Sequence, residues 1–412
     1  MSDQKDFRLG NSPLKWGIMI IKPKIWNNLC VTAHPLGCAA QVRSQIDYVR
    51  AKSKIDGPKK TVVIGASNGY GLAARIVSAF GSGSATIGVS YERAGKENRP
   101  ATAGWYNTKS FITEARKAGR PAWDVNGDAF SEEIKTQVVD LVKENLGYVD
   151  FFVYSIAAPR RIDPKTGEIY SSVIKPIGEK FTAKTVDFHT GKVRDVTAEP
   201  ATKKEIDQTI KVMGGEDWAL WIKRLLQENL IKNGFLTIAF SYIGPEIAKA
   251  IYRDGTIGRA KWDLESKADE INRLIAPVNG KAMISVNKAL VTRASAVIPA
   301  VPLYIALLYK VMKEKQLHEG CIRQIHRLYH DVLFAGKDPK LDSKGRIRMD
   351  DWEMRKDVQQ TVSKLWKIVE TKNLDNIEDL GDIKGMREEY LRHNGFGMPG
   401  VDYSRDVAPD IF

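Results

Sequence analysis

Short runs of consecutive apolar residues, separated by polar or glycine-containing stretches, recur along the chain as far as Val286. Most of these runs are β-branched or aromatic and are bounded by Gly, Asn or Asp, which is typical of buried parallel strands. They predict strands at Thr61–Ile64, Ala85–Val89, Trp123–Val125, Phe151–Ser155, Leu236–Phe240 and Ala282–Val286.

Helical periodicity fills several of the intervals between the predicted strands. In "SEEIKTQVVDLVKENL", Ser131 to Leu146, Ser131 is suited to cap a helix, and Glu133 in the first turn is favourable to the helix dipole. Alternating strands and helices predict an α/β fold, with a Rossmann-type doubly wound parallel sheet and helices on both of its faces.

Two parts of the chain depart from this alternation. Turn-rich segments at residues 160–232 predict an insertion, or substrate-side subdomain, between the fourth and fifth strands. Beyond Val286 the pattern becomes mostly helical. The apolar stretch from Ala294 to Tyr309 contains prolines and is short for a membrane span, so we expect a buried helix pair there. The whole pattern predicts one large domain with embellishments.

Composition narrows the set of partners. The chain of 412 residues has a formal charge of +13, which suits an anionic partner. The basic residues are scattered, as on a solvated surface, and no basic run interleaved with aromatic residues indicates nucleic-acid binding. A phosphate-rich cofactor or an acidic carrier protein fits better. Three dispersed cysteines and a start without an apolar signal core predict a cytoplasmic protein.

The stretch "KKTVVIGASNGYGLAARIVSAF" places a strand, a glycine turn and a helix in succession, with G-x-x-x-G-x-G at Gly65, Gly69 and Gly71. Such a turn gathers backbone N–H groups at a helix N-terminus, which suits a pyrophosphate. Glu92 follows the second strand, 21 residues beyond Gly71, where a carboxylate binds both ribose hydroxyls of NAD and repels the 2′-phosphate of NADP. We favour NADH, although an arginine such as the neighbouring Arg93 is able to accommodate that phosphate.

Two further strand ends support a dinucleotide site. Asp128 follows the third strand, where a carboxylate is able to reach an adenine amino group. Ser155, Ile156 and Ala157 lie at the carboxyl end of the fourth strand, facing the crevice where cofactors bind in such folds. Together these positions predict a hydride-transfer enzyme.

The glycine turn is similar to that of the short-chain dehydrogenase superfamily, whose members use a tyrosine and a lysine. The phenol donates a hydrogen bond or a proton to the reacting carbonyl oxygen. The lysine is expected to lower the pKa of the phenol and to bind the nicotinamide ribose. Tyr309 and Lys313 have the usual Y-x3-K spacing, but they follow the sixth strand, and Tyr309 continues an apolar helical stripe. We expect Tyr309 to pack in the core.

A second candidate set lies in "SYIGPEIAKAIYRDGTIGRAK", directly after the fifth strand. It offers Tyr242, then Tyr252, then Lys261 in a Y-x8-K spacing. Gly255 and Gly258 are expected to break the helix between Tyr252 and Lys261, which would let the two side chains converge. From the spacing alone, both candidate pairs remain open.

Two clusters contain residue types that ligate metals. His326 and His330 lie four residues apart on a predicted helix. No acidic general base or further ligand motif accompanies them. Cys30, His34 and Cys38 lie near the start of the chain, where we expect a structural role. We predict no metal site.

The chain closely resembles the trans-2-enoyl-CoA reductase / NADH-dependent enoyl-acyl-carrier-protein reductase family, whose active-site motif is Y-x8-K. The resemblance covers nearly everything from Met19 to about Tyr403. The motifs that carry it, in chain order, are "MIIKPKIWNNLCVTAHPLGC", "GPKKTVVIGASNGYGLAARI", "TAGWYN", "NGDAFS", "VYSIAAPRR", "VMGGEDW", "SYIGPE", "GTIGRAK", "NKALVTRASAVIP", "VMKEK", "MDDWEM" and "HNGFGMPGVDYS".

The resemblance implies a role for each matching residue. Tyr252 would be the catalytic tyrosine, Lys261 would support it and bind the cofactor ribose, and Tyr242 would line the substrate site. Glu92 would set the preference for NADH over NADPH. The residues expected to contact the cofactor are Gly65, Ala66, Ser67, Asn68, Gly69, Tyr70, Tyr91, Glu92, Asp128, Ala129, Ile156, Ala157, Lys261, Leu290, Val291 and Thr292.

The resemblance also implies a reaction, in which hydride adds at C3 of a trans-2-enoyl thioester and a proton adds at C2. Coenzyme A and acyl carrier protein both stay open as the acyl carrier, and the family indicates a monomer. Family members begin near Met19, so residues 1–18 form an extension of unknown role before a reductase domain at 19–412. The alternatives are a short-chain dehydrogenase that acts on a ketone or alcohol, and a non-catalytic NAD-binding acyl-carrier module.

Overall fold

The computed structural model describes residues 18–26, 29–97, 99–187, 189–292, 295, 298–372, 374 and 376–410. The predicted N-terminal extension therefore lies outside the described residues except for its last position. Within the described part, two antiparallel strands of two residues each precede the first helix: β1 (Ile25–Trp26) and β2 (Leu29–Cys30).

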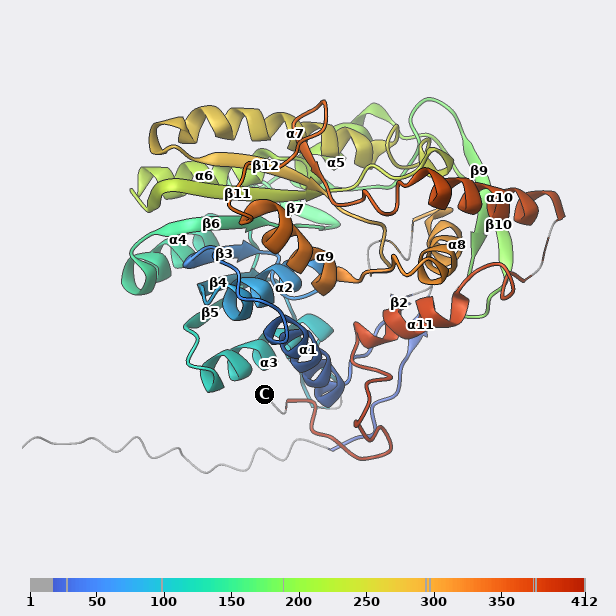
Figure 1. Cartoon of the computed structure of the whole chain (residues 1–412), viewed down its shortest axis with the longest axis horizontal. Helices are drawn as coiled ribbons and strands as arrows, with labels where there is room; N and C mark the ends of the chain where they lie inside the picture. Colours follow the sequence, from blue (N-terminus) through green and yellow to red (C-terminus); the bar gives the residue numbers. More distant parts are fainter. Residues whose placement is uncertain are drawn as a thin grey trace, which may run out of the picture.

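A seven-stranded sheet forms the centre of the molecule, in the order β13-β12-β11-β6-β3-β4-β5, and every neighbouring pair is parallel (Figure 1). Each predicted strand is present. The order confirms a doubly wound sheet that grows outward in both directions from β3 and β6. The strands are β3 (Lys60–Ile64), β4 (Ala85–Ser90), β5 (Ala122–Asn126), β6 (Val149–Tyr154), β11 (Ile231–Ser241), β12 (Lys281–Val286) and β13 (Arg346–Arg348).

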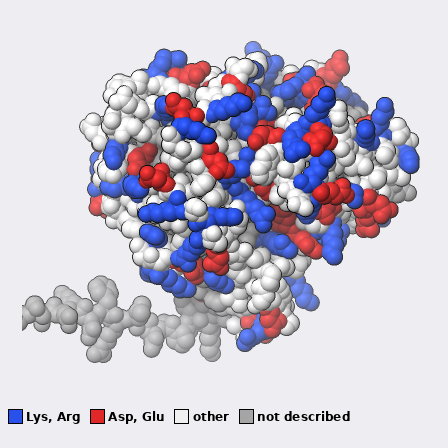
Figure 2. All heavy atoms as spheres, viewed as in Figure 1, with Lys and Arg blue, Asp and Glu red and all other residues white. Residues whose placement is uncertain are grey.

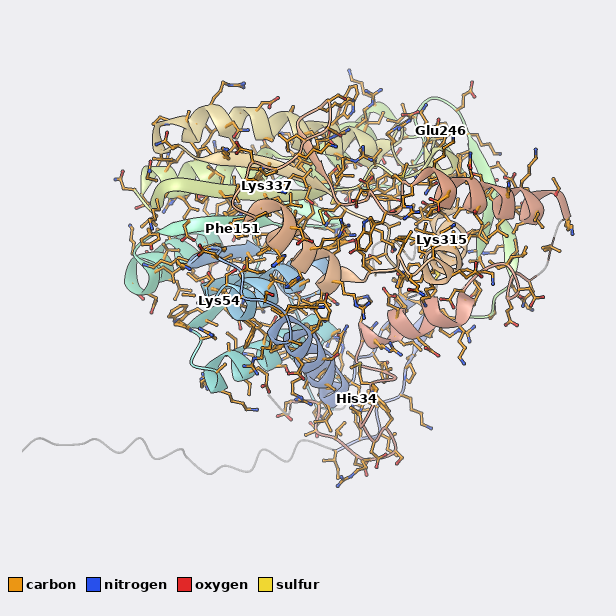
Figure 3. The ribbon with its side chains drawn as sticks, viewed as in Figure 1. His34, Lys54, Phe151, Glu246, Lys315 and Lys337 are labelled. Atoms are coloured by element: carbon orange, nitrogen blue, oxygen red, sulfur yellow. The ribbon has the colours of Figure 1, made fainter. Side chains whose placement is uncertain are left out.

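Both faces of the sheet are covered, because side chains alternate between them along each strand. Val62 and Ile64 belong to one apolar cluster, with helices α4 (Glu132–Leu141), α6 (Glu216–Gln227) and α7 (Thr256–Ile275). Val63 belongs to the opposite cluster, and Figure 3 shows Phe151 of that cluster inside the sheet on β6. The helices on this second face are α1 (Pro35–Arg50), α2 (Gly69–Ile76), α3 (Ala103–Lys117) and α9 (Cys321–Arg327).

The predicted helix from Ser131 is confirmed. The Ser131 hydroxyl accepts a hydrogen bond from Ile134 N at 3.3 Å and so caps α4. Beyond Leu141 the helix continues as a wider π turn, Val142–Leu146, to the predicted end. Similar π turns extend α2 over Val77–Gly81 and α9 over Leu328–Leu333.

The stretch between β6 and β11 holds two antiparallel hairpins and two helices. One hairpin pairs β7 (Arg160–Ile162) with β8 (Ile169–Ser171), and the other pairs β9 (Phe181–Val186) with β10 (Val193–Ala198). Helix α5 (Lys203–Met213) follows them. Helix α6 also lies within 160–232, yet it packs on the sheet as the crossover between β6 and β11. The predicted insertion at residues 160–232 therefore includes one helix, α6, that belongs to the helices covering the sheet.

The C-terminal part is mostly helical, as predicted. Figure 1 shows α8 (Val301–Glu314), α10 (Lys356–Lys372) and α11 (Ile383–Arg392) gathered beside the sheet, where α10 and α11 both contact α8. Of the expected buried helix pair, the described residues show the buried helix α8, which begins after Ala300, a residue with a positive φ of 64°. Residues 294, 296 and 297, where the pair was expected to begin, lie outside the described residues. Over the described residues, no helix combines the length and the apolar character needed to span a membrane.

Charges of both signs are interspersed on the face that Figure 2 shows, so the net charge of +13 is not gathered there into one basic patch. His34 of the N-terminal cysteine–histidine cluster, labelled at the start of α1 in Figure 3, accepts a hydrogen bond from Gly37 N at 3.2 Å and lies edge-on to Tyr403 at 4.8 Å. It therefore caps a helix and holds the C-terminal loop against it.

Candidate active site

The principal cavity lies at the carboxyl ends of the central strands and has a volume of about 770 Å³. Its walls come from the turn after β3, the end of β4, and the segments after β5 and β6. Thr292 and His393 close it on the side of the C-terminal part. Ligands bind in doubly wound folds at this edge of the sheet, where the strand order reverses.

The glycine turn forms the floor of the cavity. Gly65 has a φ of +83°, and a Cβ atom there would lie 2.1 Å from the Ser155 carbonyl oxygen. Only glycine allows this close approach of two chain segments. Asn68 caps α2, with its side chain accepting from Gly69 N at 2.9 Å, and Gly69 and Tyr70 of the first helical turn line the cavity. This arrangement suits a pyrophosphate.

Tyr70 stands on the cavity wall and joins the turn to the rest of the site. Its ring lies 5.7 Å from that of Phe240, at the end of β11. Its hydroxyl donates to the backbone carbonyl oxygen of Lys288 at 2.9 Å. Tyr70 thus presents only its ring to the cavity, while its hydroxyl ties the turn to the segment that follows β12.

Glu92 is held from three sides at the end of β4. Its carboxylate accepts from the Ser67 hydroxyl at 2.7 Å. Its backbone N–H donates to Asn126 Oδ1 at 2.8 Å, and Asn126 Nδ2 donates to its carbonyl at 2.9 Å. A Cβ atom on Gly104 would lie 2.0 Å from Glu92 Oε1. The carboxylate is therefore fixed at the cavity, whereas the Arg93 guanidinium donates to the Pro100 carbonyl and is not on the cavity wall.

The predicted tyrosine pair forms beyond the end of β11. The rings of Tyr242 and Tyr252 meet edge to face, with centroids 4.9 Å apart. The Tyr252 carbonyl accepts from Gly255 N at 3.2 Å and from Gly258 N at 3.0 Å, which folds the turn onto the start of α7. Gly255 precedes α7 as predicted, but Gly258 lies inside the helix and does not break it.

Lys261 extends from the first part of α7 toward the end of β11, and its ammonium donates to the Phe240 carbonyl at 3.0 Å. Burial lowers its pKa to about 8, opposed by the nearby Glu265 carboxylate. Burial raises the pKa of the Tyr252 phenol above its ordinary value, the direction opposite to the expected lowering.

Most predicted cofactor residues meet around the cavity. Ala66 is buried beneath the turn. Leu290, Val291 and Tyr252 belong to one apolar cluster, and Tyr70 and Tyr242 pack against that cluster. Neither Tyr252 nor Lys261 lines the principal cavity. Lys261 reaches the Phe240 carbonyl, and the Phe240 ring lies 5.7 Å from that of Tyr70 on the cavity wall, so this group of residues flanks the cavity at the end of β11. The predicted residues on the wall are Gly65, Ser67, Asn68, Gly69, Tyr70, Tyr91, Glu92, Asp128, Ala129, Ile156, Ala157 and Thr292.

The alternative pair is placed elsewhere. Tyr309 is fully buried in α8, as predicted, and its hydroxyl accepts from Val291 N at 3.0 Å and donates to Glu389 at 2.9 Å. Lys313 forms an ion pair with Asp382. Neither residue lines the cavity.

Several wall residues were missed from the sequence. The β7–β8 hairpin contributes Ile162 and Ile169, which face each other across the two strands. His393 reaches the cavity from the end of α11, and its Nε2 atom is buried with no partner among the described residues. His393 lies in the motif "HNGFGMPG", but no strand end or glycine turn marks it as a site residue.

The second histidine cluster has no ligand arrangement. The His326 and His330 rings stack 5.6 Å apart, and burial lowers the pKa of His326. Over the described ranges, no group of three or more His, Cys, Asp or Glu side chains is placed to hold a metal ion.

The cavity fits a dinucleotide in size and in its polar groups. A phosphate-binding turn lies in its floor, and a fixed carboxylate stands at the end of β4, where ribose hydroxyls bind in this fold. Fold and cavity together define the class: an oxidoreductase that uses a nicotinamide dinucleotide.

Comparison with known proteins identifies the family. The trans-2-enoyl-CoA reductase catalytic region matches residues 99–334, and the NAD(P)H binding domain of trans-2-enoyl-CoA reductase matches residues 20–97. A third model, described as an enoyl reductase FAD binding domain, matches residues 341–407. The chain belongs to the trans-2-enoyl-CoA reductase family, which confirms the resemblance seen in the sequence.

Individual relatives agree over nearly the whole chain. An NADH-dependent enoyl-acyl-carrier-protein reductase of Flavobacterium johnsoniae is 54% identical over 94% of this chain and 98% of its own length. A trans-2-enoyl-CoA reductase (NADH) of Ruminiclostridium cellulolyticum is 53% identical, covering 95% and 98%. The crystal structure of Treponema denticola trans-2-enoyl-CoA reductase in complex with NAD has 49% identity and a TM-score of 0.90, covering 95% of this chain and 98% of its own.

The C-terminal segment matched by the third family model is part of the same site. It adds β13 to the sheet, and His393 is its contribution to the cavity wall. The glycine turn and the strand ends that form the other walls are those of a nicotinamide dinucleotide site, so we derive no step through a flavin.

Proposed function

We propose that this protein uses NADH to reduce the carbon–carbon double bond of trans-2-enoyl thioesters to saturated acyl thioesters, in fatty-acid synthesis. The observation that carries the proposal is the contact between Tyr242 and Tyr252, 4.9 Å apart, on the flank of the dinucleotide cavity where Lys261 reaches Phe240. Bound NADH supplies the hydride that adds at C3 of the substrate.

The chain's own residues act on the thioester carbonyl. Tyr252, which keeps its proton because burial raises its pKa, donates a hydrogen bond to the carbonyl oxygen as negative charge builds there, and it supplies the proton that ends on C2. Lys261 holds the cofactor ribose and supports Tyr252. Tyr242 lines the substrate side of the pair.

Glu92 selects the cofactor in this proposal. Its carboxylate, fixed by the Ser67 hydroxyl at 2.7 Å, binds the ribose hydroxyls of NADH. A 2′-phosphate at the same place would meet a fixed negative charge. The Arg93 guanidinium is bonded to Pro100 and does not compensate for that charge.

We further infer that the substrate is carried by coenzyme A or by acyl carrier protein, and that the protein acts as a monomer in the cytoplasm. Both carriers are polyanions and suit a chain of net charge +13. No disulfide joins Cys30, Cys38 and Cys321, which is consistent with a reducing compartment. Light scattering of the purified protein measures its mass and so tests the monomer.

Initial rates on enoyl-CoA and enoyl-carrier-protein substrates, each with NADH and with NADPH, test the proposed function. We expect turnover with NADH and a saturated acyl thioester as the product. Reduction of ketones with no enoyl turnover would instead favour an ordinary short-chain dehydrogenase. Tight NADH binding without turnover of either thioester would favour a non-catalytic NAD-binding module.

A further inference from the structure

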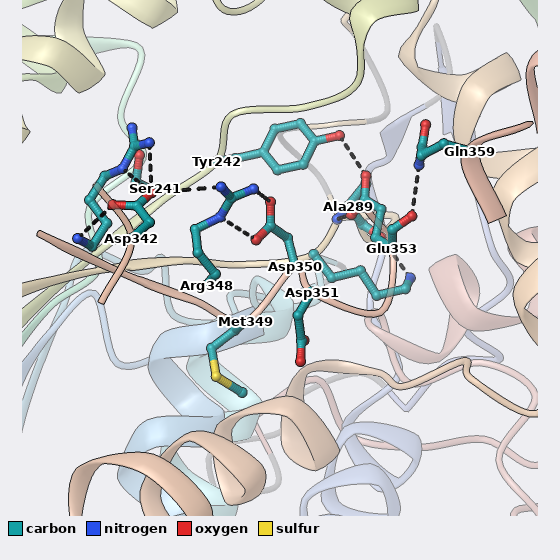
Figure 4. Close-up of polar contacts among 12 residues, drawn as sticks. Ser241, Tyr242, Ala289, Asp342, Arg348, Met349, Asp350, Asp351, Glu353 and Gln359 are labelled. Atoms are coloured by element: carbon teal, nitrogen blue, oxygen red, sulfur yellow. Dashed lines mark hydrogen bonds and ion pairs between the residues drawn. The ribbon is translucent and has the colours of Figure 1, made fainter. Parts of the chain in front are cut away.

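A fully buried carboxylate stands behind the tyrosine pair and has no role in the proposed chemistry. Glu353 is 0% exposed and lies in the turn between β13 and α10. Figure 4 shows the Tyr242 hydroxyl donating to it. The Tyr242 hydroxyl donates to Oε1 at 3.2 Å, the Tyr304 hydroxyl donates to the same oxygen at 2.7 Å, and Ala289 N–H donates to Oε2 at 2.7 Å.

Three hydrogen-bond donors converge on the Glu353 carboxylate. Gln359 Nε2 donates to the Tyr304 hydroxyl at 3.0 Å, so that hydroxyl must direct its own proton at Glu353. Burial raises the pKa of Glu353, and the nearby Lys288 ammonium opposes this effect. Asp350 is the other charged group that acts on it, and it raises the pKa. An ionised carboxylate accepts all three of these hydrogen bonds.

The turn that carries Glu353 is itself rigidly placed. The Arg348 guanidinium, at the end of β13, donates two hydrogen bonds to the Asp350 carboxylate, at 2.7 and 2.6 Å (Figure 4). Arg327 of α9 forms an ion pair with Asp351 at 3.0 Å. The edge strand β13 therefore sets the position of Glu353 relative to the sheet.

Glu353 also fixes the segment that leads from β12 to the cavity. Tyr70 holds this segment from the other side by donating to the Lys288 carbonyl, while Glu353 accepts from the next N–H, that of Ala289. Three residues further on, Thr292 lies on the cavity wall. One carboxylate thus contacts both the substrate-side tyrosine and the cofactor-side segment.

We propose that Glu353 is a positioning residue, which holds Tyr242 edge-on against Tyr252 and keeps the Lys288–Thr292 segment in place at the cofactor. The inference rests on the proposed function, because it assigns Tyr242 and Tyr252 to the reacting thioester. Glu353 touches neither substrate nor cofactor and acts through Tyr242 and Ala289.

The test is a double-mutant cycle between Glu353→Gln and Tyr242→Phe, with crotonyl-CoA and NADH as substrates. Glutamine keeps the shape of the side chain, but its amide group donates where Glu353 accepts. We expect Glu353→Gln to lower kcat/KM by about tenfold or more. Because Glu353 acts in part through Tyr242 and in part through Ala289, the fold loss of kcat/KM in the double variant should be smaller than the product of the two single losses.

Tyr304→Phe is the matched control, since it removes the other hydroxyl donor from the same carboxylate oxygen and leaves Tyr242 in place. We expect its midpoint of thermal unfolding to fall while kcat/KM stays within about threefold of the wild type. A purely structural role for Glu353 would instead make Tyr304→Phe and Glu353→Gln lose activity in proportion to their loss of stability, and that result would overturn the proposal.

Two other results would also overturn it: kcat/KM of Glu353→Gln within twofold of the wild type, or losses in the double variant that multiply as for independent sites. If Glu353→Gln does not fold, Glu353→Asp carries the same cycle, because it keeps the charge and withdraws the carboxylate from Tyr242. Tyr252→Phe separates the two hypotheses. Full activity in that variant refutes the role given to Tyr252, and absence of crotonyl-CoA turnover by the wild type refutes the proposed function. An inactive Tyr252→Phe beside a fully active Glu353→Gln refutes this inference alone.

Discussion

At the scale of single residues, the site depends on a few side chains whose neighbours leave them one conformation. Glu92 is the clearest case. Its carboxylate accepts from the Ser67 hydroxyl, its backbone is hydrogen-bonded to the Asn126 side chain, and the missing side chain of Gly104 leaves room for its carboxylate. A surface acid after a strand has none of these constraints. In the proposed function, this fixed position is what would let one charge discriminate between NADH and NADPH.

Substituting Glu92 tests that discrimination. Glu92→Gln removes the charge while keeping the shape, so we expect the ratio of kcat/KM with NADH to kcat/KM with NADPH to fall by about tenfold or more. Steady-state rates with the two cofactors measure the ratio. Glu97→Gln removes an exposed acid from the same strand end and serves as the control. An unchanged ratio in Glu92→Gln would place the origin of the preference elsewhere.

Gly104→Ala tests the same carboxylate without changing its charge. The added methyl group would lie 2.0 Å from Glu92 Oε1 and must displace it from Ser67. We expect the KM for NADH to rise about tenfold or more with kcat much less affected, because binding is disturbed and the reacting groups are not. An unchanged KM would show that Glu92 does not need its present position.

The lowered pKa of Lys261 predicts that kcat/KM for NADH depends on pH. Its pKa of about 8 lies below the ordinary value because of burial, so the ammonium loses its proton as the pH rises through about 8. If the charged form holds the cofactor ribose, kcat/KM for NADH should decline above that pH. Glu265→Gln removes the carboxylate that raises this pKa and should move the decline to lower pH. A profile that is flat from pH 7 to 9, on the order of one unit either side of that pKa, would contradict a role for the charged amine.

The lowered pKa of Lys261 also determines how this group's contribution to the free energy of unfolding changes with pH. Between about pH 8 and the ordinary value of 10.5, the unfolded chain binds a proton at Lys261 that the folded chain has already released. Stability contributed by this group therefore rises with pH over that window. Activity and stability should thus change in opposite directions as the pH increases.

At the scale of elements, the glycine turn is the part with least freedom to vary. Gly65 has a positive φ of +83°, which disfavours alanine, and the Cβ atom added in Gly65→Ala would lie 2.1 Å from the Ser155 carbonyl oxygen. We expect the change to shift the turn away from β6, to weaken NADH binding by an order of magnitude or more, and to lower the midpoint of thermal unfolding. Fluorescence titration with NADH measures the binding. Gly147→Ala, in a turn where a Cβ would meet nothing, controls for backbone strain alone.

The elements that the sequence predicted are those with a continuous apolar signal. The runs that became β3, β4 and β6 are buried on both faces, so their composition alone identifies them. The strand β13 was missed because it is only three residues long and two of them are arginine, whose charges are satisfied by Asp342 and Asp350. Such compensation depends on tertiary contacts and has no local pattern.

The candidate site also combines residues that a local sequence pattern predicts with residues that only tertiary contacts bring together. The predicted cofactor residues at strand ends follow from the topology of the sheet, since the carboxyl ends of parallel strands meet at one edge. Tyr252 and Lys261 needed the family resemblance, because two spacings were open from the residues alone. Glu353 and His393 come from the C-terminal part, more than a hundred positions beyond Tyr242, and only the fold brings them to the site.

At the scale of the whole molecule, buried polar contacts tie the layers to the cavity. Lys135 of α4 forms an ion pair with Asp217 of α6 at 2.9 Å, and both side chains are almost fully buried. The same ammonium donates to the carbonyls of Ala129 and Phe130, which lie on the cavity wall. The contact that joins two helices therefore also holds the segment after β5.

Removing that ammonium should destabilise the whole fold. Lys135→Met leaves the Asp217 charge buried without its partner, and we expect the free energy of unfolding to fall by about 3–5 kcal/mol. Lys143→Met removes an exposed partner of Glu228 and should cost no more than about 1 kcal/mol. Denaturant unfolding measures both. Equal losses in the two variants would show that burial does not decide the contribution of the pair.

The central claim is that the chain reduces enoyl thioesters through Tyr252 rather than through Tyr309. The most direct measurement is kcat/KM on crotonyl-CoA with NADH for Tyr252→Phe and Tyr309→Phe, with the NADH dissociation constant determined for each. We expect Tyr252→Phe to bind NADH as the wild type does but to lose about a hundredfold or more in kcat/KM, whereas Tyr309→Phe retains turnover. Full activity in Tyr252→Phe, with none in a folded Tyr309→Phe, would contradict the account.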